Sequence, residues 1–131
     1  MRNSWITLQR TNTILYCRYW METVHFYKKQ LCFPVSFEND WFVEFQLTST
    51  SFLSIANSAR ATIDDVQGQG VTLTWEVTDL EDAKEHLEMQ GIATTPIQRK
   101  WGALAFYCTD PEGHRLEFWT QANGKRSSLD E

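Results

Sequence analysis

The chain has 131 residues, 42% of them hydrophobic, which is enough to bury the core of one domain or of two small modules. Its formal net charge of -5 argues against nucleic acid as a partner, because phosphate binding needs clustered Lys and Arg. The first residues contain no apolar signal core, and no run of apolar residues approaches the length of a membrane span. We therefore expect a soluble, cytoplasmic protein without a membrane partner.

The three cysteines are widely spaced and form no CxxC or CxxH pair. This spacing predicts neither a disulfide framework nor a zinc site. Each cysteine lies among apolar residues, so we expect small buried hydrophobic side chains in a reducing compartment: Cys17, Cys32 and Cys108.

The first half of the chain reads as β-α-β-β-β. Residues 1–11 are polar with a few apolar side chains, which predicts either an added edge strand or an arm that docks on a partner. A β-rich run follows, and then a segment with apolar residues at helical spacing that ends before Pro34. The predicted strands are 12–18, 35–38, 41–47 and 52–56, and the predicted helix is 20–31.

A small, polar connector over residues 57–69 separates this half from a second β-α-β-β-β pattern. Thr78 and Glu81 have the spacing of a helix capping box, and Gly91 suits the left-handed residue that ends a helix. The expected elements are strands at 71–77, 92–98, 103–108 and 115–120 and a helix at 80–90. A polar tail over 122–131 completes the chain.

The last two strands flank a turn-forming segment, Asp110–Gly113. Its proline presets φ for an early turn position, and Gly113 accepts a positive φ where the chain reverses. After the turn, Leu116 and Phe118 alternate with Glu117, so the carboxylate is expected on the opposite face of the strand. In so apolar a strand, a carboxylate needs a partner, a ligand or water.

A pattern found twice at a spacing of about 60 residues indicates duplicated modules, because shorter periods are typical of solenoids. The predicted fold is α+β, with two tandem βαβββ modules forming a curved mixed sheet around a concave cleft and with the helices outside. We expect module 1 at about 12–57 and module 2 at about 70–121, within one domain.

Residues 12 to about 121 resemble the vicinal oxygen chelate superfamily. This group includes glyoxalase I, bleomycin-resistance proteins, fosfomycin-resistance enzymes and extradiol dioxygenases. The segment DPEGHRLEF at 110–118 is similar to the family's closing D-P-x-G-x-x-[IL]-E-[LF] hairpin. The run Glu76–Leu80 and the pair Phe26 and Tyr27 also fit.

The resemblance implies metal-ligand positions on the first and last strand of each module, which fall here on Asn12, Ser54, Thr72 and Glu117. Only Glu117 keeps the family's His and Glu chemistry, so we expect no tightly held metal and no cofactor. The three histidines are expected to be ordinary exposed side chains, two on helices and one in the turn: His25, His86 and His114.

Strand alternation predicts an aromatic cleft with three carboxylates and one guanidinium. For each residue alone, solvation or pairing across strands is the more ordinary explanation, but the cleft as a whole suits a flat ligand with a cationic group. The candidate ligand-binding residues are Tyr16, Phe42, Glu44, Ser54, Thr72, Glu76, Arg115, Glu117 and Trp119.

Two functions from different classes follow. The first is a small-molecule binding protein, similar to the bleomycin-resistance proteins, that sequesters a cationic or aromatic compound without a metal. The second is a glyoxalase- or dioxygenase-like enzyme with an altered or absent metal site. A third interpretation is a family member that is degenerate in function or that acts through a protein partner. We also expect a homodimer, because related proteins commonly pair and six tryptophans exceed what one small core can hide.

Overall fold

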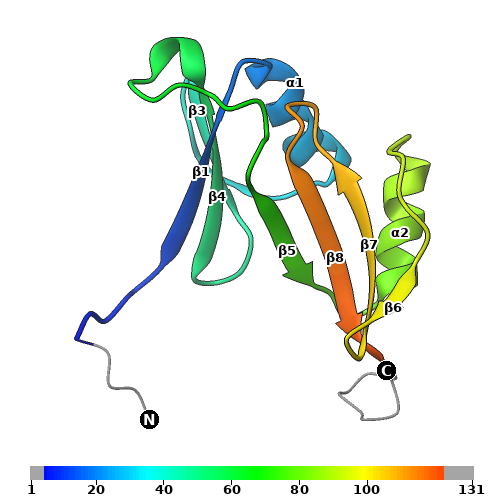
Figure 1. Cartoon of the computed structure of the whole chain (residues 1–131). Helices are drawn as coiled ribbons and strands as arrows, with labels where there is room; N and C mark the ends of the chain where they lie inside the picture. The colour runs from blue at the N-terminus through cyan, green and yellow to red at the C-terminus, as the bar shows by residue number, and fades with distance from the viewer. Residues whose placement is uncertain (1–4, 123–131) are drawn as a thin grey trace. The chain divides into compact units, whose positions relative to one another are not determined.

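The computed structural model describes residues 5–122, which are drawn in colour in Figure 1. The chain divides into two compact units, Met1–Val66 and Gln67–Glu131, which we call module 1 and module 2. That they form one domain around a shared cleft stays a prediction. Among the described residues, no helix is long and apolar enough to cross a membrane. The predicted tail lies outside the described residues except for Ala122.

Module 1 contains one four-stranded sheet and one helical segment. Its strands run in the order β1-β4-β3-β2, with β1 parallel to β4 and the other neighbours antiparallel. Its elements are β1 (Thr11–Cys17), α1 (Trp20–His25), the π-helical η1 (Phe26–Gln30), β2 (Val35–Glu38), β3 (Phe42–Gln46), β4 (Ser51–Asn57) and the 3₁₀ turn η2 (Ser58–Arg60).

Module 2 repeats this plan, with the strand order β5-β8-β7-β6 and with β5 parallel to β8. Its elements are β5 (Thr72–Glu76), α2 (Leu80–Met89), β6 (Gln98–Lys100), β7 (Ala103–Thr109) and β8 (Arg115–Gln121). The predicted α+β fold of two βαβββ modules is therefore confirmed.

Side chains alternate between the two faces of each sheet, and the helix covers one of them. We call the opposite face, which carries the carboxylates of the sheet, the polar face. In module 1, Tyr27 of the helical segment is fully buried and its ring lies 6.1 Å from that of Phe45. In module 2, Phe106 and Phe118 stack at 5.2 Å, and α2 contacts the strands β7 and β8 that carry them. The intervening residues, Glu44 and Glu117 among them, therefore belong to the polar faces.

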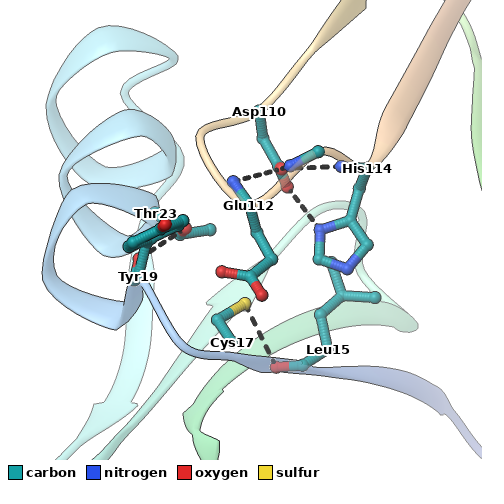
Figure 2. A network of polar contacts seen from close by, with 8 residues as sticks. Leu15, Cys17, Tyr19, Thr23, Asp110, Glu112 and His114 are labelled. Atoms are coloured by element: carbon teal, nitrogen blue, oxygen red, sulfur yellow. Dashed lines mark hydrogen bonds and ion pairs between the residues drawn. The ribbon is translucent and has the colours of Figure 1, made fainter. Parts of the chain in front are cut away.

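The turn between β7 and β8 depends on the side chain of Asp110 (Figure 2). Its Oδ1 accepts hydrogen bonds from the backbone N–H groups of Glu112, Gly113 and His114 at 2.9–3.0 Å. Gly113 has a φ of 108°, and a Cβ there would lie 2.9 Å from the carbonyl oxygen of Gln67. The turn predicted from the DPEG segment is thus confirmed.

The prediction that all three histidines are exposed was wrong for His114. Its side chain is buried, and its Nδ1 lies 2.8 Å from Oδ2 of Asp110. The same aspartate therefore organises the turn with one oxygen and holds the imidazole with the other. His25 and His86 are exposed on their helices.

Two predictions about the first part of the chain were also wrong. Residues 5–10 form no strand, so the edge-strand interpretation fails for them, and β1 begins at Thr11. Cys32 is exposed, unlike Cys17 and Cys108, and it lies just after the helical segment with a φ of 60°.

The strand predicted at 92–98 is shorter and later, because β6 spans only Gln98–Lys100. Pro96 has no N–H for a ladder of hydrogen bonds, and the hydroxyl of Thr95 accepts the N–H of Tyr107 in place of a carbonyl. Ile92 instead follows the end of α2, and its N–H donates to the carbonyl of Leu87 in that helix.

The capping box predicted from Thr78 and Glu81 was wrong by one residue. The helix begins at Leu80, and Asp79 caps it by accepting the N–H of Asp82 at 3.0 Å.

We expect Asp79→Ala to lower the free energy of unfolding by about 1 kcal/mol, because it removes the acceptor for an end N–H of the helix. The matched change Thr78→Ala should cost no more than about 0.5 kcal/mol. Urea denaturation of both variants measures the difference. A larger loss of stability in Thr78→Ala than in Asp79→Ala would show that Thr78 is the capping residue after all.

Candidate functional site

Glu117 lies on the polar face of module 2, in the central position between two hydroxyl-bearing neighbours. The strand register places Thr74 of β5 on one side and Tyr107 of β7 on the other. The hydroxyl of Thr74 donates to Oε1 at 2.5 Å, and that of Tyr107 donates to Oε2 at 2.8 Å. Each carboxylate oxygen therefore has one protein donor and keeps capacity for another.

These contacts keep the carboxylate ionised. The hydrogen bond from Thr74 is the largest cause that holds the pKa of Glu117 below its ordinary value, with Tyr107 and the charges of Lys100 and Arg115 acting in the same direction. Partial burial opposes the shift without reversing it. Glu117 makes no ion pair with any residue that the structure describes, so its charge is held by hydroxyl groups alone in its immediate contacts.

A pocket of about 300 Å³, which we call the Trp119 pocket, opens beside Glu117. Its lining combines the carboxylate and Thr74 with the side chain of Lys100, two indoles and two alanines: Thr74, Lys100, Trp101, Ala103, Ala105, Glu117 and Trp119. Trp101 lies in the turn between β6 and β7, with a φ of 57° and 87% of its surface exposed. Since a bulky residue is unusual at positive φ, this turn presents the indole at a conformational cost.

Arg115 lies two residues before Glu117 on the same face. Its Nε donates to Oγ1 of Thr72 at 2.9 Å, and its guanidinium carbon lies 5.0 Å from the ring centroid of Tyr107. Tyr107 therefore contacts both charged groups of β8, through its hydroxyl and through its ring.

The polar face of module 1 carries its carboxylate on a different strand. Glu44 of β3 accepts hydrogen bonds from Arg10 at 2.8 Å, from Asn12 at 3.3 Å and from Ser36 at 2.7 Å. The guanidinium of Arg10 also lies 3.6 Å above the ring of Phe52. The carboxylate of Glu44 is thus already paired with a cation of the chain itself, Arg10.

The remaining predicted residues lie on the polar faces without joining the Trp119 pocket. Tyr16 and Phe42 are half-buried in module 1, and Ser54 is buried and donates to Oδ1 of Asn12 at 2.9 Å. Glu76 is exposed and pairs in register with Trp119.

Within each module, the positions equivalent to the family's metal ligands do not fit a transition metal. Asn12 and Ser54 bond to each other, and the hydroxyl of Thr72 faces the cationic Arg115. Across residues 5–122, no three His, Cys, Asp or Glu side chains gather as a metal site would require.

A sequence profile of the Glyoxalase/Bleomycin resistance protein/Dioxygenase superfamily matches residues 12–118. The chain belongs to this superfamily. No functionally curated protein matches it. The resemblance inferred from the DPEGHRLEF segment is confirmed. The same segment contains Glu117.

Solved structures share the fold. A glyoxalase/bleomycin resistance protein/dioxygenase from Nocardioides is 19% identical, with a TM-score of 0.77, and the match covers 96% of this chain and 91% of that one. A lactoylglutathione lyase from Agrobacterium tumefaciens is 15% identical, with a TM-score of 0.70 and coverage of 90% and 95%. A glyoxalase-related enzyme from Fulvimarina pelagi is 18% identical, with a TM-score of 0.71 and coverage of 92% and 98%.

Sequence reasoning missed Tyr107 and Trp101 beside Glu117, and in module 1 it missed Arg10 beside Glu44. Tyr107 could have been found, because pairing β7 with β8 across the predicted turn places it opposite Glu117. Trp101 and Arg10 gave no such signal, since each lies outside a strand.

We expect Thr74→Val to raise the pKa of Glu117, because it removes the largest stabilising contact of the ionised form. Tyr107→Phe should raise it less. An NMR titration of the Glu117 carboxyl carbon measures both shifts. Equal pKa values in wild type and Thr74→Val would contradict the assignment.

The same contact has a consequence for stability. Because the pKa of Glu117 is lower in the folded than in the unfolded chain, its stabilising contribution is complete above the ordinary value of 4.5. That contribution is lost as pH falls through the folded-state pKa. Thr74→Val should therefore lose less stability than wild type as the solution is acidified below about pH 4.5.

Proposed function

We propose that this superfamily member is a small-molecule binding protein that takes a cationic, aromatic compound without a metal. The observation that carries the proposal is the ionised Glu117 beside the Trp119 pocket, with hydroxyl donors and no ion-pair partner among the described residues. Such a carboxylate supplies a charge-assisted hydrogen bond to an ammonium or amidinium group.

The aromatic part of the proposed ligand follows from the two indoles that line the pocket. Trp119 is half-buried beside Glu117, while Trp101 is largely exposed. Exposed tryptophan at a pocket rim gains apolar contact when a flat ligand stacks on it, and its ring face also attracts cations.

Module 1 supports the same chemistry by example. There the guanidinium of Arg10 binds Glu44 while lying over Phe52, so the chain already places a cation between a carboxylate and an aromatic ring. In the Trp119 pocket, we propose that the ligand supplies that cation.

The alternative is a glyoxalase- or dioxygenase-like lyase or oxidoreductase with an altered metal site. Glu117, at a ligand position of the family, and the fold shared with a lactoylglutathione lyase favour it. The weak donors at Asn12, Ser54 and Thr72 count against it. A homodimer and a cytoplasmic location remain predictions from the sequence.

The binding test starts with a thermal-shift screen of cationic glycopeptides and aromatic amines. For a compound so found, Glu117→Gln should weaken binding about tenfold or more, because a charge-assisted hydrogen bond contributes ~1.5–3 kcal/mol. Trp119→Ala should weaken binding as well, through the lost stacking face. The matched control Glu85→Gln removes an equal charge from an exposed position of α2 and should leave the affinity unchanged. Unchanged affinity in Glu117→Gln would refute the proposal.

Metal analysis separates the two functions. We expect purified protein to hold no stoichiometric Zn, Ni, Mn or Fe, because the ligand positions carry weak oxygen donors. Elemental analysis by mass spectrometry tests this directly. About one metal ion per chain, together with a loss of thermal stability on adding a chelator, would favour the enzyme.

A further inference from the structure

Module 2 has a second pocket, of about 440 Å³, which shares Tyr107 with the site around Glu117. We call it the Arg115 pocket. Its polar lining consists of one guanidinium, three threonines, a tyrosine and a thiol: Arg115, Thr94, Thr95, Thr109, Tyr107 and Cys108. No carboxylate among residues 5–122 lines it.

Arg115 brings an unneutralised positive charge to this pocket. Its one hydrogen bond to a described residue uses Nε, toward Thr72, and it forms no ion pair with any residue between 5 and 122. The two terminal nitrogens of the guanidinium therefore keep their donors, in the fork that matches a carboxylate.

Of the other ionisable groups near the pocket, Lys100 and Glu117 both contact Tyr107 and carry opposite charges, and Lys84 and Cys108 add no net charge. Lys84 donates to Thr94 and to the carbonyl of Thr95, but it is paired with Glu88 at 2.8 Å. Burial, more than the nearby Asp110, raises the pKa of Cys108 to about 11, so its thiol is neutral. One positive charge suits a monoanion such as a carboxylate better than a phosphate dianion.

Hydroxyl groups in the Arg115 pocket can donate further hydrogen bonds to a bound carboxylate. Thr109 pairs in register with Arg115 and makes no hydrogen bond with a described residue through its side chain. The hydroxyl of Thr95 accepts the N–H of Tyr107 and keeps its own proton to donate.

The two charged sites are spaced for one ligand. Arg115 and Glu117 lie two residues apart on the same face of β8, which places their Cα atoms about 6.6–6.8 Å apart along the strand. Tyr107 contacts both side chains. Building on the proposed function, we propose that the ligand is a zwitterion, with an ammonium group at Glu117 and a carboxylate in the Arg115 pocket, joined by an aromatic spacer.

Three probes of one shape test this inference: 4-(aminomethyl)benzoate, benzylamine and 4-methylbenzoate. The first has both charges at opposite ends of a ring, and each of the others has one. Ligands of about ten heavy atoms at ~0.3 kcal/mol per atom bind with millimolar Kd, which NMR titration of ¹⁵N-labelled protein measures.

We expect 4-(aminomethyl)benzoate to bind roughly threefold to tenfold more tightly than benzylamine. It should shift the amide signals of both Lys100 and Thr109, whereas benzylamine should shift only the former. In Arg115→Gln this advantage should vanish while benzylamine binds slightly more tightly, because a nearby positive charge is gone. The control Arg60→Gln removes an exposed arginine of module 1 and should keep the advantage.

The outcomes distinguish the two proposals. Equal affinity of the zwitterion and benzylamine, with no shift at Thr109, would overturn the zwitterion and leave the cation site standing. Binding of 4-methylbenzoate alone, lost in Arg115→Gln, would support the anion subsite and defeat the cationic ligand. No binding by any probe at about 10 mM would overturn both, since even a poorly fitted ligand of this size should be detected there. The ¹⁵N spectrum of each variant verifies that it is folded.

Discussion

The site of module 2 depends on the hydrogen bonds that the carboxylate of Asp110 accepts. By accepting three backbone N–H groups and holding His114, it closes the turn between β7 and β8. The turn sets the register of the hairpin, and the register places Glu117 opposite Tyr107. A slip of one residue would send Glu117 to the face that holds Leu116 and Phe118.

The two modules show how one backbone plan carries different chemistry. Ser54 and Glu117 occupy equivalent places on β4 and β8, and their partners across the neighbouring strand are Glu44 and Tyr107. In module 1 the acid is on β3 and the hydroxyl on β4, whereas in module 2 the hydroxyl is on β7 and the acid on β8. In module 1 the acid is bound by Arg10, while in module 2 its direct partners among the described residues are hydroxyl groups. This difference makes module 2 the better candidate for an external cation.

The sequence alone determined the repeat, the fold class and the face on which Glu117 lies. These follow from local rules, because alternation along a strand and apolar spacing along a helix are properties of neighbouring residues. The turn at Asp110–Gly113 was predictable for the same reason. The failures at Thr78 and at residues 92–98 concern where an element begins, which small differences in hydrogen bonding decide.

Only the tertiary structure decided which groups meet Glu117 and which charge is already satisfied. Thr74 lies 43 residues from Glu117 along the chain, and Arg10 reaches Glu44 across 34 residues. The burial of His114 likewise depends on packing that its exposed-looking turn sequence does not reveal. Side-chain partners across strands are set by register and packing together, so a sequence specifies the face of a residue more readily than its contacts.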